Sequence, residues 1–237
     1  MKVGEPIYSE TCPELYFHGV LTRVGSFTLD NTGVLSLANR PLTLQLQELE
    51  NGGIPINIAR GNTYTAVEPY ILDLLAYHDS RLRCQLNSIN DESDCRAQMA
   101  AITGMRAVLP HFLDRDLRDR PFLFTLTDIH QSNIYVDEQW HIKYLIDLEW
   151  ACSLPIQMQN PPHWLTSQGV DHLRGEHLAK YDRIREEFME AFEYEEKLKN
   201  GWKLQRDIYE ESMGSWKLLL LSSLIFDHRA FQFVGTK

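Results

Sequence analysis

The segment from residue 122 to 150, FLFTLTDIHQSNIYVDEQWHIKYLIDLEW, constrains the fold of this 237-residue chain more than any other part. Two apolar runs in it, 122–126 and 144–146, predict buried strands. Between them, a short run at 134–136 and its return at 141–146 are separated by the polar turn Asp137-Glu138-Gln139. Such runs on both sides of a turn predict a β-hairpin.

Polar side chains stand where this hairpin begins and ends. Asp128 and Asn133 are in the loop that enters the hairpin, and Asp147 follows its last strand. Because antiparallel strands run about 4.8 Å apart, Asn133 and Asp147 should be neighbours although they are fourteen positions apart. We therefore expect one site at the open end of the hairpin.

The residue types at this open end suit phosphoryl transfer of the kinase type. In that chemistry one carboxylate accepts the proton of the attacking hydroxyl group, while an amide oxygen and a second carboxylate hold Mg²⁺. Mg²⁺ takes hard oxygen ligands and few of them from the protein, which fits Asn133 and Asp147 and leaves Asp128 as proton acceptor. The alternative for Asp128 and Asn133 alone is a chance pairing of two good turn formers. Asp147 and Glu149, directly after an apolar strand, favour a site.

The runs LTDIHQSNIYVD and LIDLEWA resemble the catalytic core of the aminoglycoside phosphotransferase and choline kinase superfamily, whose usual form is HGDxHxxNxxVD followed by IDxE. They are especially similar to fungal phosphotransferase-like proteins of unknown substrate. The resemblance implies that Asp128 is the catalytic base and that Asn133 and Asp147 bind the cofactors, Mg²⁺ and ATP. It places Glu149 near the metal. His130 matches the family's second histidine, with a packed loop histidine that hydrogen-bonds the backbone as the alternative.

The chain departs from the family pattern at two places. Leu126-Thr127 stands where the family most often has His-Gly, so the loop is either looser or rebuilt. Residues 1–60 contain no glycine-rich loop followed by a strand lysine, and their single lysine is Lys2. We therefore expect an α+β, mainly helical fold: a kinase-like C-terminal lobe at 61–237, a small N-terminal extension at 1–60, and an N-terminal lobe that is largely missing.

Local patterns predict the elements around the central segment. Residues 26–29 and 34–37 alternate on both sides of the turn Asp30-Asn31-Thr32-Gly33, which predicts a second hairpin at about 26–37. Residues 65–68 have the form of a capping box before a helix to about residue 83, and further helices are expected at about 93–113, 178–198 and 202–231. Residues 1–13 should be an irregular arm, and 42–49 fits a strand or a short helix.

Composition excludes several classes of function. A formal net charge of −10 argues against a nucleic-acid-binding surface, which needs clustered Lys and Arg. The four cysteines are scattered without a CxxC pair, so neither a zinc site nor a disulfide framework is indicated. The N-terminus has no apolar leader, and the longest apolar run, at 218–226, is short and interrupted by two serines. We expect a cytoplasmic protein that does not span a membrane.

Three functions compete at this stage. The first is an ATP- and Mg²⁺-dependent phosphotransferase that transfers the γ-phosphate to a hydroxyl group of a small molecule. Such a protein could be inactive alone, because it lacks an N-terminal lobe. The second is a catalytically dead, pseudokinase-type binding module. A metal-dependent hydrolase is weaker, because it usually needs a further histidine or carboxylate ligand. The acidic stretch 186–196 could contact a cationic acceptor, or it is a solvated helix face.

Overall fold

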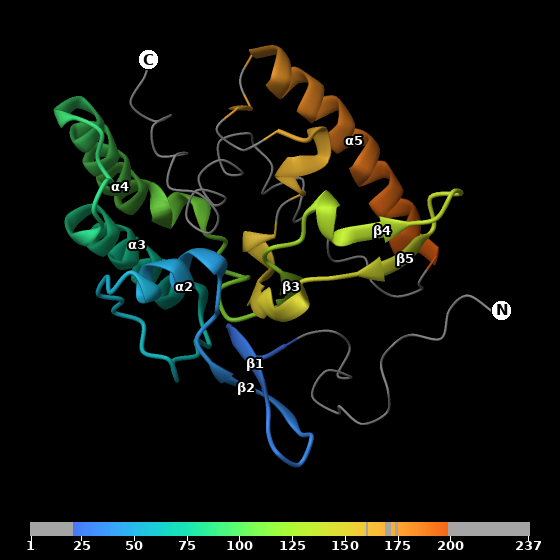
Figure 1. Ribbon diagram of the computed structural model, residues 1–237, viewed down its shortest axis with the longest axis horizontal. Coiled ribbons are helices and arrows are strands. Elements are labelled where there is room, and N and C mark those ends of the chain that lie inside the picture. The colour runs from blue at the N-terminus through green and yellow to red at the C-terminus, as the bar shows by residue number, and fades with distance from the viewer. Residues whose placement is uncertain (1–20, 160, 169–171, 174, 199–237) are drawn as a thin grey trace.

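The computed structural model describes residues 21–159, 161–168, 172–173 and 175–198 (Figure 1). These residues fold into α+β structure with two antiparallel sheets, which confirms the expected class. The expected arm at 1–13, the helical stretch at 202–231 and the apolar run at 218–226 lie outside the described residues. No helix in the described part of the chain combines the length and the apolar character needed to cross a membrane.

The larger sheet has four strands in the order β2-β1-β6-β3. Its first two strands form the expected N-terminal hairpin, in which Asp30 Oδ1 accepts hydrogen bonds from the backbone N–H groups of Thr32 and Val34 at 2.8 and 2.9 Å. Gly33 takes the positive φ of 84° that completes the turn. The strands of this sheet are β1 (Gly25–Leu29), β2 (Leu35–Asn39), β3 (Phe122–Leu126) and β6 (Ala151–Pro155).

Strand β6 lies between β1 and β3 and was not predicted from the sequence. It pairs antiparallel with β3, from Phe122 opposite Pro155 to Leu126 opposite Ala151, and with β1 through residues 152 and 153. Residues 152–155 are all buried. Because the strand is short, buried on both faces and closed by a proline, it lacks the alternation that marks a half-buried strand.

The helices largely follow the predicted pattern. Residues 44–51 form a helix, which decides between the two alternatives for 42–49, and Thr43 Oγ1 accepts a 3.4 Å hydrogen bond from the Leu46 N–H at its start. The pairing of α3 with α4 and the position of α5 are visible in Figure 1. The helices are α2 (Leu44–Asn51), α3 (Val67–Cys84), α4 (Glu92–Phe112) and α5 (Gly175–Leu198).

The capping box predicted for α3 is wrong. The helix begins after Ala66, which provides no side-chain cap. Arg118 contacts both the first backbone N–H of the helix and the glutamate of the expected capping box. Its carbonyl oxygen accepts a 2.8 Å hydrogen bond from the Val67 N–H, and its Nε lies 3.2 Å from Glu68 Oε1. A contact distant in sequence thus replaces the local cap.

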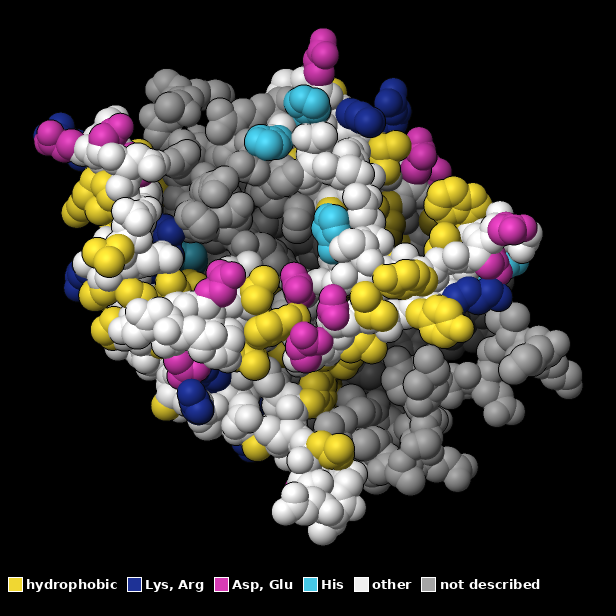
Figure 2. All heavy atoms as spheres, viewed as in Figure 1, with side chains coloured by type: hydrophobic (Ala, Val, Ile, Leu, Met, Phe, Trp, Pro, Cys, Tyr) yellow, Lys and Arg dark blue, Asp and Glu magenta, His cyan; other side chains and the backbone are white. Residues whose placement is uncertain are grey.

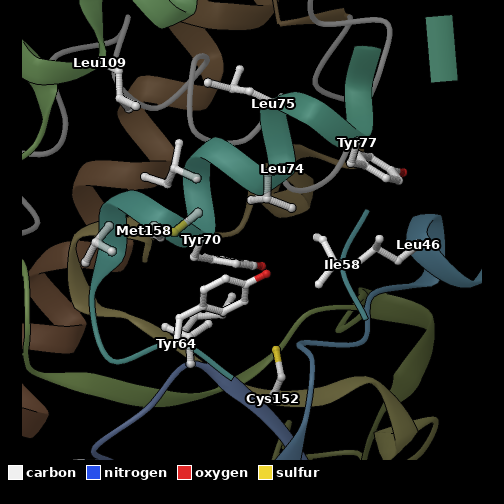
Figure 3. Packing of buried hydrophobic residues seen from close by; sticks show 14 of the residues in the cluster. Leu46, Ile58, Tyr64, Tyr70, Leu74, Leu75, Tyr77, Leu109, Cys152 and Met158 are labelled. Carbon is white, nitrogen blue, oxygen red and sulfur yellow. The ribbon is translucent and has the colours of Figure 1, made fainter. Parts of the chain in front are cut away.

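The main hydrophobic core lies between α3 and the larger sheet (Figure 3). The rings of Tyr64 and Tyr70 pack at 5.3 Å, and the Cys152 side chain of β6 is part of the same buried cluster. Leu46 and Ile58 also belong to it, so residues on both sides of position 60 share one core and one sheet.

The second sheet is the predicted hairpin of β4 (Ile134–Val136) and β5 (Ile142–Leu145). Its position is confirmed, but the expected burial of residues 144–146 is wrong. Tyr144 is 71% exposed and Ile146 is 40% exposed. Apolar residues of a strand are buried only where another helix or sheet packs against that strand. No described element packs extensively on this hairpin.

Candidate functional site

Asp128 lies in the loop that follows β3, two residues beyond the end of the strand. Its side chain is half-buried. Burial raises the pKa of its carboxyl group above the ordinary value, and the negative charges of Asp147 and Glu149 raise it further, whereas His130 opposes them. The carboxylates of Asp147 and Glu149, at the other end of the hairpin, therefore act electrostatically on Asp128.

Asn133 ends the 3-10 helix η1 (Gln131–Asn133) and joins the loop to the hairpin. Its Nδ2 donates a 3.2 Å hydrogen bond to the Asp128 carbonyl oxygen. Its own carbonyl oxygen accepts a 3.1 Å hydrogen bond from the N–H of Ile146, the residue before Asp147. The structure therefore brings the loop and the end of the hairpin together at Asn133, as the predicted hairpin requires.

Asp147 connects β5 to the 3-10 helix η2 (Leu148–Trp150). Its backbone is left-handed, with φ 57° and ψ 49°, a conformation in which Asp and Asn are enriched among non-glycine residues. The Asp147 side chain makes no capping hydrogen bond to η2 and is exposed. The sharp turn thus places an uncapped carboxylate at the open end of the hairpin, and Glu149 follows it within η2.

Acidic side chains gather near the middle of the face shown in Figure 2. No group of three or more His, Cys, Asp or Glu within the described ranges is placed to hold a metal ion on its own. Mg²⁺ keeps several water ligands and usually takes one or two carboxylates together with substrate phosphates. The oxygen atoms of Asn133, Asp147 and Glu149 have the donor chemistry for such a shared ion.

His130 has a structural place in the loop. Its Nδ1 accepts a 3.4 Å hydrogen bond from the Ser132 N–H, and its ring packs against Trp164 at 5.8 Å. Ser167 Oγ also donates a 3.0 Å hydrogen bond to Gln131 Oε1. These contacts fit the alternative of a packed loop histidine that bonds the backbone, and they join the loop to the 3-10 helix η4 (His163–Thr166) and the residue that follows it.

Thr127 is a site residue whose role sequence reasoning missed. Its N–H and its Oγ1 hydroxyl both donate to the carbonyl oxygen of Trp150, at 3.1 and 2.8 Å. This extends the β3–β6 pairing by one step beyond Leu126 and Ala151. The signal in the sequence was a threonine, a side chain that can form hydrogen bonds, at the strand end where the pattern that the chain resembles most often has glycine.

An exposed apolar surface adjoins the acidic side chains. It covers the hairpin and its end, and Figure 2 shows hydrophobic side chains on the same face as the acidic ones. Tyr135 and Tyr144 are paired across the two strands, and both are exposed. The other exposed apolar residues of this surface are Val136, Trp140, Ile142, Leu145, Ile146 and Leu148.

Three comparisons with known proteins give no further constraint. No family model, no curated protein and no solved structure matches the chain.

Proposed function

We propose that the chain is an ATP- and Mg²⁺-dependent phosphotransferase-like protein that transfers the γ-phosphate to a hydroxyl group of a small molecule. The observation that carries the proposal is the connected site in which Asn133 bonds the Asp128 carbonyl oxygen and the end of β5. The kinase-like character of the lobe is part of the same proposal and rests on the sequence resemblance.

Each side chain has a role that suits its surroundings. Asp128 accepts the hydroxyl proton of the acceptor, and its raised pKa makes it a stronger base than an ordinary aspartate. Asn133 and Asp147 hold Mg²⁺, with Glu149 beside them. The bound ion neutralises charge on the transferring phosphoryl group. The exposed apolar surface of the hairpin offers contact area for the base of the nucleotide.

Turnover of ATP tests this proposal. We expect ADP release that needs both Mg²⁺ and a hydroxyl acceptor, and we expect it to fall by at least about 100-fold in Asp128→Asn, since a positioned base contributes about 10²–10⁴. Asp147→Ala should abolish the activity. Asp116→Asn is the matched control, because Asp116 is an exposed aspartate outside the carboxylate cluster. Activity that survives Asp147→Ala would contradict the assignment.

The second candidate is a catalytically dead binding module of pseudokinase type. It is favoured by the lack of a glycine-rich loop and a strand lysine in residues 1–60. Binding of ATP without turnover under any acceptor condition would support it. The identity of the hydroxyl acceptor stays a prediction. In the acidic stretch that could contact a cationic acceptor, Glu186, Glu187 and Glu190 on α5 are exposed, as residues of a solvated helix face would be.

A further inference from the structure

We propose that Thr127 is a positioning residue whose hydroxyl group fixes the loop of Asp128 and Asn133 against the turn of Asp147 and Glu149, so that Asn133 and Asp147 can hold one divalent cation beside the Asp128 carboxylate. The inference rests on the function proposed above, since it concerns the same site. It adds a residue that differs from the glycine most often found at this place in the family pattern.

The argument begins with a closed circuit of hydrogen bonds. Thr127 bonds the Trp150 carbonyl oxygen, which stands at the end of η2. From there the chain runs back through η2 to Ile146, whose N–H bonds the Asn133 carbonyl oxygen. The Asn133 side chain then bonds the carbonyl oxygen of Asp128, the residue next to Thr127. Every segment that bears a site carboxylate is therefore part of one ring.

The ring matters because the segments in it have little packing to hold them. Asp147 and Glu149 are exposed, and η1 and η2 are single turns of three residues. The negative charges of Asp147 and Glu149 also repel the Asp128 carboxylate, which favours separation of the segments that carry them. Directional hydrogen bonds must then maintain the spacing that a shared cation needs.

Thr127 supplies a bond to this ring that glycine cannot supply. A glycine would keep the 3.1 Å bond from the backbone N–H, but only a hydroxyl side chain gives the 2.8 Å bond to the same oxygen. A carbonyl oxygen has two lone pairs, so the Trp150 oxygen can accept from the N–H and from the hydroxyl group of Thr127 at the same time. The side chain is half-buried, so water competes less well for this bond.

The test uses Thr127→Val, which keeps the shape and loses the hydroxyl, and Thr127→Ser, which keeps the hydroxyl. Thr125→Val is the matched control: Thr125 Oγ1 bonds Leu123 O on the same strand and accepts from Gln159 Nε2, outside the ring. The first readout is Mn²⁺ affinity of the full chain by electron paramagnetic resonance, without nucleotide. The second is hydrogen exchange of the Ile146 amide, measured without metal.

We expect Thr127→Val to weaken Mn²⁺ binding about 5- to 10-fold, the equivalent of one net hydrogen bond, and to speed exchange of the Ile146 amide by a similar factor. Thr127→Ser should stay within about twofold of the wild type in both readouts. Unchanged exchange in Thr127→Val, or an equal effect of Thr125→Val, would overturn the positioning role. Absence of Mn²⁺ binding in the wild type would count against the proposed function, while the exchange readout would still decide the role of Thr127.

Discussion

Replacing Asp128 by asparagine should stabilise the folded chain at neutral pH. Asp128 lies half-buried within electrostatic reach of Asp147 and Glu149, and the pKa of its carboxyl group is raised above the ordinary value of 3.8. Close pairs of charges at a protein surface are each worth a few tenths to about 1 kcal/mol. Removing one member of two repulsive pairs should therefore raise the free energy of unfolding by about 1 kcal/mol at pH 7.

The sign of the pH dependence follows from the raised pKa. The folded state holds the Asp128 proton more tightly than the unfolded state, so the ionised form disfavours folding above the folded-state pKa. As the pH falls through the raised pKa toward 3.8, the wild-type side chain becomes neutral like asparagine. The advantage of Asp128→Asn should therefore shrink over this window and vanish below it.

Urea unfolding at a series of pH values between 7 and 4 measures this difference, with Asp116→Asn as the control that should change little. A thermal scan should show a gain of about 2–4 °C at pH 7, which corresponds to about 1 kcal/mol in a domain of this size. A loss of stability at pH 7, or a gain that does not depend on pH, would refute the idea that Asp147 and Glu149 repel the Asp128 carboxylate in the folded chain.

Three further predictions concern the scaffold. Glu50→Gln should lower the free energy of unfolding by about 2–3 kcal/mol in urea titrations, because Arg40 is 4% exposed and its 2.8 Å partner loses the negative charge that compensates it. Arg60→Gln, which alters an exposed partner of Glu50, should cost less than about 1 kcal/mol. Leu154→Ala in β6 should cost about 2–5 kcal/mol in the same assay, and a cost below about 1 kcal/mol would contradict the central place of this strand, where Leu154 is 1% exposed. Iodoacetamide at pH 8 should label the exposed Cys84 and spare Cys152 until urea is added, because burial raises the pKa of the Cys152 thiol to about 12; fast labelling of native Cys152 would contradict its burial.

Elements with local signals were predictable from the sequence. The turn of Asp30 to Gly33 marks the first hairpin, and the polar turn at 137–139 marks the second, because turn chemistry is written in a few adjacent residues. Helices α3, α4 and α5 follow from their apolar spacing. The loop, hairpin and second aspartate of the candidate site were located in the same way.

Features that depend on distant contacts were not predictable. Strand β6 finds its place only because β1 and β3 flank it, and α3 begins where Arg118 satisfies Val67 rather than at a local cap. The exposure of β5 depends on which elements fail to cover it. The bond from Thr127 to Trp150 joins positions 23 residues apart, so no local pattern around Thr127 contains it.

Titration calorimetry of ATP against the full chain, with and without Mg²⁺, tests the central claim most directly. The claim is that Asn133 and Asp147 hold a metal ion shared with nucleotide phosphates. It predicts saturable binding of ATP that requires Mg²⁺ and is lost in Asp147→Ala, with Asp116→Asn behaving as the wild type. Binding that is equal without Mg²⁺, or that is unchanged by Asp147→Ala, would contradict it.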